Sequence, residues 1–82
     1  MFGRKKSKEV MELEELLNTL QMNLENNYKD LAIKAYKDSE EYLEELNAKG
    51  LLKSKAYTGY RVRLDEYKKR MEGYSHRLKI NF

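Results

Sequence analysis

The chain contains no cysteine, no proline and no tryptophan, and it has one histidine among its 82 residues. Without cysteine, neither a disulfide framework nor a thiolate site can form. A single histidine and no cysteine also exclude a transition-metal site within one copy of the chain. No glycine-rich phosphate loop is present either, and the sequence resembles no family that would suggest a cofactor. We therefore expect neither metal nor cofactor.

Long apolar runs are also missing. No stretch approaches the roughly 18 consecutive apolar residues that a membrane-spanning helix needs. The basic start, Met1–Lys6, is not followed by the apolar segment of a secretory signal. We expect a cytoplasmic protein with a flexible basic tail over residues 1–7 and a single helical domain over residues 8–82.

The composition is instead rich in charge, and the charge is unevenly distributed. Hydrophobic residues make up 40% of the chain and charged residues 38%, which is too apolar for a disordered segment and suits solvated helices. Residues 8–48 hold four lysines against eleven acidic residues, whereas residues 49–82 hold ten basic residues against three acidic ones. The sequence thus predicts one acidic arm and one basic arm.

The acidic arm has the apolar spacing of a helix. Ser7 is a candidate N-cap, and apolar residues then recur every three or four positions. They are Val10, Leu13, Leu17, Leu20 and Leu24, followed by Tyr28, Ala32, Ala35, Ser39, Tyr42 and Leu46. The pattern slips at Asn26-Asn27, where neither glycine nor proline marks an end. We favour one long helix over about 8–48; the alternative is a break in which Asn27 caps a new helix, which would give a three-helix bundle.

A marked turn follows at Gly50. Glycine suits the left-handed residue that ends a helix, and Leu51 stands where a Schellman motif places an apolar contact, here with Leu46. Ser54 is the candidate N-cap of a second helix over about 54–79. These signals predict an antiparallel helical hairpin.

The second helix has a regular heptad-like row of tyrosine, leucine and methionine, typical of a coiled coil. We expect this row to pack against the small residues Ala32, Ala35 and Ser39. Basic residues flank the row, with Arg63, Arg70 and Arg77 on one side and Arg61 and Lys68 on the other, and the acids Asp38 and Glu45 border the facing row of the first arm. The expected hairpin core is Leu46, Leu51, Tyr57, Tyr60, Leu64, Tyr67, Met71 and Tyr74.

The two arms differ in length. At 1.5 Å per residue, the first helix would extend roughly 60 Å and the second roughly 39 Å. Four leucines of the first arm would then remain uncovered, as an apolar strip of the kind that marks an interface. They are Leu13, Leu16, Leu17 and Leu20. We expect a homodimer, and hence a helical bundle, to bury them.

No constellation of catalytic residues emerges. His76 falls on an outer face without a carboxylate partner, and the paired glutamates have the spacing of a solvated helix face. The sequence favours a non-enzymatic protein–protein interaction module that self-associates. The alternative is a nucleic-acid-binding protein that uses the basic second helix, with Arg63, Arg70 and Arg77 contacting the phosphates.

Overall fold

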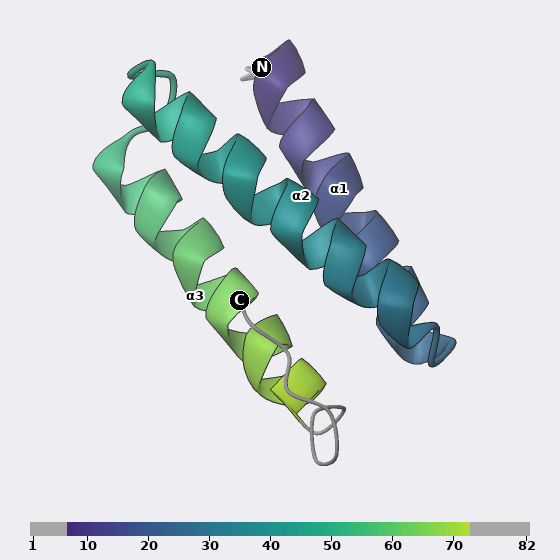
Figure 1. Cartoon of the computed structure of the whole chain (residues 1–82). Helices are drawn as coiled ribbons and strands as arrows, with labels where there is room; N and C mark the ends of the chain where they lie inside the picture. The colour runs from purple at the N-terminus through teal and green to yellow at the C-terminus, as the bar shows by residue number, and fades with distance from the viewer. Residues whose placement is uncertain (1–6, 73–82) are drawn as a thin grey trace, which may run out of the picture.

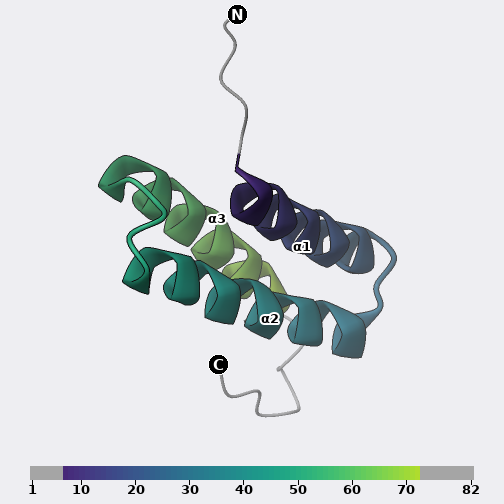
Figure 2. The same cartoon turned by 90° about the horizontal axis from the view of Figure 1, so that it is seen from above.

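The computed structural model describes residues 7–72 and folds them into three helices, with no strand in this range. They are α1 (Lys8–Glu25), α2 (Lys29–Ala48) and α3 (Ser54–Glu72). The helix α2 lies between the other two in Figure 1, and Figure 2 shows α1 and α3 on the same side of it. The all-α class is therefore confirmed, and the architecture is the three-helix alternative.

The helix α1 begins where the sequence predicted. The backbone N–H of Val10 donates a 3.1 Å hydrogen bond to the Ser7 hydroxyl, which makes Ser7 the N-cap. Glu9 places a negative charge in the first turn, near the positive end of the helix dipole.

The favoured continuous helix over residues 8–48 is wrong, because α1 ends in a Schellman motif at the two asparagines. The N–H of Tyr28 donates to the Asn23 carbonyl at 2.9 Å, and that of Asn27 donates to the Leu24 carbonyl at 3.1 Å. Asn27 has a φ of 59°, a left-handed conformation that asparagine tolerates better than most residues with a Cβ. Asn27 therefore ends α1 rather than capping α2. The N-cap of α2 is Tyr28, whose side chain makes no capping hydrogen bond.

The second turn repeats the same motif with glycine. The N–H of Leu51 donates to the Leu46 carbonyl and that of Gly50 to the Asn47 carbonyl, both at 3.0 Å, and Gly50 has a φ of 72°. The predicted turn is confirmed. Leu51, however, remains 47% exposed and does not join the core as expected, and Ser54 is the first residue of α3.

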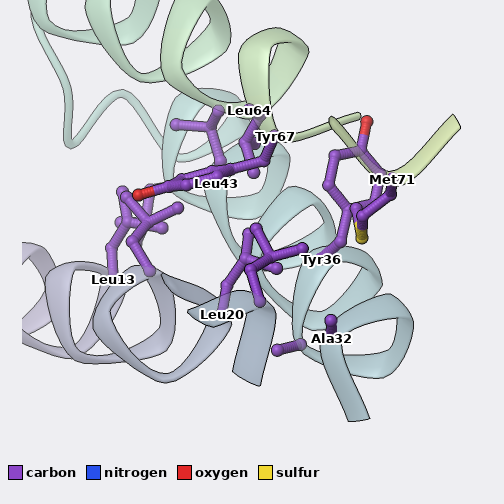
Figure 3. Packing of buried hydrophobic residues seen from close by; sticks show 12 residues of the cluster. Leu13, Leu20, Ala32, Tyr36, Leu43, Leu64, Tyr67 and Met71 are labelled. Carbon is purple, nitrogen blue, oxygen red and sulfur yellow. The ribbon is translucent and has the colours of Figure 1, made fainter. Parts of the chain in front are cut away.

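The core draws on all three helices. The small residues Ala32, Ala35 and Ser39 of α2 are buried in it, together with larger side chains of α1 and α3. Figure 3 shows Leu13 and Leu20 rising from α1 towards Leu43 and Leu64, with Tyr36 beside Met71. The buried apolar residues are Leu13, Leu17, Leu20, Leu24, Ala32, Ala35, Tyr36, Leu43, Leu46, Leu64, Tyr67 and Met71.

The turn at Asn27 removes the exposed strip that the sequence led us to expect. Because α1 folds back onto α2, Leu13, Leu17 and Leu20 are each 0% exposed within a single chain. Leu16 is half-buried at the edge of the α1–α2 interface. The expected second helix over 54–79 is described as far as Glu72, so the end of that helix, together with Tyr74, lies outside the described residues.

The two described glycines should respond in opposite directions to alanine. Gly50→Ala should destabilise the fold by about 1–2 kcal/mol, because the left-handed conformation is unfavourable for a residue with a Cβ. Gly59→Ala is the matched control. A methyl group there would meet no atom within 4 Å, and alanine is the better helix former by about 1 kcal/mol.

Urea denaturation followed by circular dichroism would measure both changes. A Gly50→Ala variant that is as stable as the wild type, or more stable, would contradict the role assigned to Gly50.

Candidate interaction surfaces

Four tyrosine hydroxyls connect the helices at the rim of the core. Each phenol packs its ring against apolar neighbours, and its hydroxyl donates a hydrogen bond to a carboxylate or amide oxygen of another helix. The bonds are Tyr60 to Glu14 at 2.8 Å, Tyr67 to Gln21 at 3.1 Å, Tyr57 to Glu44 at 2.7 Å, and Tyr42 to Glu12 at 2.8 Å. Because these bonds join α3 to α1, α3 to α2, and α2 to α1, they fix all three helices relative to one another.

The expected hairpin core is therefore largely present, with its tyrosines at the edge. Leu46, Leu64 and Met71 are at most 1% exposed, and Tyr67 is 9% exposed. Tyr57 and Tyr60 pack against the core while remaining half-buried. The sequence pattern located these rings, but their hydroxyl partners depend on how the helices cross.

Arg61 lies at the centre of the ion pairs between α2 and α3. Its guanidinium is 3.1 Å from Glu40, 3.2 Å from Glu44 and 3.6 Å from Asp65. The sequence pattern placed Asp38 and Glu45 beside the facing row, and the structure instead brings Arg61 to Glu40 and Glu44, which lie on a different face of α2. With about a quarter of its side chain exposed, Arg61 joins α3 to α2 more firmly than a fully solvated pair would.

A groove of about 420 Å³ runs between α1 and α2, and it is acidic. Asp38 is paired with Lys34 of α2, and Glu45 with Lys49, the C-cap of α2, each at 2.9 Å. Among the described residues, no lysine or arginine lines the groove itself. Its lining is Glu12, Glu15, Leu16, Thr19, Asp38, Glu41, Tyr42 and Glu45.

The acidic groove combines carboxylates of two helices with one apolar side chain. Among residues 7–72, no group of three histidine, cysteine or carboxylate side chains is arranged to hold a metal. Leu16, one of the four leucines expected at an interface, contributes an apolar contact to the groove.

Of the three arginines expected to contact phosphates, Arg63 and Arg70 lie together on α3. Arg63 is half-buried, with its guanidinium 6.0 Å from the centre of the Tyr60 ring, and Arg70 is exposed. Both line a smaller groove of about 240 Å³ together with Glu66, whose negative charge opposes phosphate binding there. Arg77 lies outside the described residues, as does His76.

An apolar patch that the sequence analysis did not single out lies at the turn between α1 and α2. Tyr28 is 55% exposed and Leu31 is 54% exposed. They stand three residues apart, so they project from adjacent points of one face at the start of α2. We call these two residues the turn patch. The helical spacing placed both of them on apolar lines, but only the break at Asn27 determines that they are exposed.

In the part of the chain that is described, no helix has both the length and the apolar character needed to cross a membrane. No protein-family model, curated protein or solved structure matches the chain. Its function has to be inferred from the surfaces described above.

Two of the tyrosine bonds predict how stability depends on alkaline pH. Burial of the ring and donation to Glu14 raise the pKa of Tyr60 to about 12, and donation to Glu12 does the same for Tyr42. In the unfolded chain these phenols ionise at the ordinary pKa of 10.0. The stability they contribute is therefore complete below pH 10 and is lost as the pH rises through about 12.

Urea denaturation at increasing pH should show the free energy of unfolding falling over this range. The fall should be smaller in Tyr60→Phe. Tyr28→Phe is the control, since the Tyr28 side chain is 55% exposed. Lysine deprotonation affects all three proteins alike. Equal falls in wild type and Tyr60→Phe would refute the contribution of the Tyr60–Glu14 bond.

Proposed function

We propose that this chain is a small, non-enzymatic protein–protein interaction module that self-associates through the faces of its helices. The observation that supports this is the turn patch. Tyr28 and Leu31 are more than half exposed side by side, although the spacing of the sequence places both on apolar lines of the helix. A second molecule that covers these two side chains with an apolar surface of its own is favoured, because both apolar surfaces are then removed from water.

The rest of the bundle supplies a scaffold for this role. The tyrosine bonds and the Arg61 ion pairs hold the three helices in a fixed arrangement, so the exposed faces are presented without further ordering. The acidic groove between α1 and α2 offers a second surface, suited to a positively charged protein segment.

The geometry gives less support to a catalytic role. Acid–base chemistry needs carboxylates in unlike, partly buried environments, so that one is protonated when the other is ionised. The groove glutamates Glu15 and Glu41 are instead exposed on neighbouring helix faces, where water solvates both of them.

The alternative, nucleic-acid binding by α3, is favoured only by the pair Arg63 and Arg70. Stacking on bases would require free aromatic rings, and the rings of Tyr57, Tyr60 and Tyr67 are already packed on the core with their hydroxyls bonded to other helices.

We expect no binding of mixed-sequence DNA or RNA by the full chain near physiological ionic strength, measured by fluorescence anisotropy. The acidic α1 and α2 helices oppose the field of α3 and weaken any attraction for phosphates. Binding that falls steeply with salt, and that Arg63→Glu with Arg70→Glu abolishes, would favour the alternative.

The self-association itself can be tested by sedimentation velocity over a range of concentrations. The average mass of the wild-type chain should rise with concentration. Leu31→Lys should weaken association by roughly tenfold or more, because it places a charge where an apolar side chain would be buried. The monomer should remain equally helical, since Leu31 is 54% exposed.

Met11→Lys is the matched control for this experiment. Met11 is 57% exposed near the opposite end of α1, and its replacement should leave association unchanged. An equal loss in both variants would point to a general charge effect. A wild-type chain that stays monomeric would refute the proposed function.

A further inference from the structure

The main apolar row slips at Asn26-Asn27, but a second row, which passes through Leu31 instead of Ala32, crosses the bend without a break in spacing. Residues Leu13, Leu17, Leu20 and Leu24 are spaced by four, three and four. Tyr28, Leu31 and Ala35 continue this row with spacings of four, three and four. On a straight helix, all seven side chains would share one face. The bend at Asn27 divides the row, and the two members that it leaves exposed are the turn patch.

At the turn itself, the bend consists of one left-handed residue and the two hydrogen bonds of the Schellman motif. Asn27 is left-handed, with a φ of 59°, although it has a Cβ. No glycine or proline lies between Glu25 and Lys29, so every residue of the turn is able to enter a helix. The N-cap side chain of α2 makes no capping hydrogen bond, so the bent form leaves helix-end donors that a continuous helix would pair internally.

We infer that two copies of this chain associate by exchanging α1, a proposal that rests on the self-association proposed above. In the exchanged dimer the turn straightens, and α1 of each copy packs on α2 and α3 of the other. The pairing of α1 with α2 remains antiparallel, as it is within one chain. The two straightened helices therefore run side by side in opposite directions about a two-fold axis.

This arrangement keeps the contacts of the single bundle. Leu13, Leu17 and Leu20 enter the same core, now across the interface, and the bonds Tyr42–Glu12 and Tyr60–Glu14 form between copies instead of within one. Because these contacts are retained, the balance between the two forms is determined at the turn.

The turn itself favours the dimer in two ways. Straightening removes the left-handed conformation at Asn27 from both chains. It also brings the two turn patches together at the two-fold axis, where Tyr28 and Leu31 of each copy lie on the face that meets the partner. The occupant of the patch is thus the same patch of a second copy.

The conformation of residue 27 provides a sharp test. Asn27→Ala favours the straight helix, since alanine is the better helix former and disfavours the left-handed turn; the association constant of the dimer should rise by roughly 100-fold over two chains. Asn27→Gly favours the turn, and the constant should fall by about tenfold. Sedimentation velocity on the wild-type chain and both variants, over a range of concentrations, measures the three association constants.

Cross-linking then identifies the exchange itself. The chain has no cysteine, so single cysteines can be introduced without background. The variants Glu12→Cys and Tyr42→Cys replace two residues whose terminal oxygens, at the tips of long side chains, meet at 2.8 Å between α1 and α2. They are mixed, unfolded in urea, refolded together and treated with a short bis-maleimide, because a direct disulfide would require closer backbones than two long side chains need. Exchange predicts a cross-link between one chain of each variant.

Met11→Cys mixed with Tyr42→Cys is the control, because Met11 is 57% exposed and lies on a different face of α1 from Glu12. It should give little mixed product.

The outcomes separate the inference from the proposed function. Association constants that decrease in the order Asn27→Ala, wild type, Asn27→Gly, together with the mixed cross-link between positions 12 and 42, support exchange. Dimers whose association constant does not depend on residue 27, or that lack this cross-link, overturn exchange and leave self-association through closed bundles in place. A wild-type chain that remains monomeric up to millimolar concentration overturns both.

Discussion

The backbone conformation of Asn27 is the constraint on which the rest of the bundle depends. A Schellman motif at this residue reverses the chain and brings α1 back along α2. Only that reversal covers Leu13, Leu17 and Leu20 within one molecule, because α3 is too short to cover the acidic arm along its whole length. The same motif, with glycine, reverses the chain again at Gly50. Two Schellman turns therefore bring the apolar faces of three amphipathic helices together into one core.

The core is small, and the tyrosines extend it to the surface. A phenol contributes a large apolar ring and still needs a partner for its hydroxyl, so it suits the rim of a thin bundle. Carboxylates of the acidic helices accept hydrogen bonds from these hydroxyls, as Glu14 does from Tyr60 and Glu44 from Tyr57. Arg61 adds ion pairs across the same boundary. The acidic and basic residues of the two arms thus form contacts between the helices of one chain.

The two proposals follow from one property, namely that the apolar row fits both a bent and a straight chain. In the bent form the row is covered internally except at Tyr28 and Leu31. In the straight form it requires a second copy. The interface leucines expected from the sequence then have the same buried surroundings in either form, and the difference between the forms lies in which molecule supplies the neighbours.

The sequence by itself determined the helical class, the turn at Gly50 and the rows of side chains that face the core, because each of these depends on local spacing or on the special freedom of glycine. It did not determine whether Asn27 is helical, since asparagine tolerates the left-handed conformation better than most residues with a Cβ, and packing of distant leucines contributes to the choice. Nor did it identify Glu40 and Glu44 as the partners of Arg61, or Glu14 as the acceptor from Tyr60. Those pairings depend on the crossing of helices far apart in the chain, which only the tertiary structure fixes.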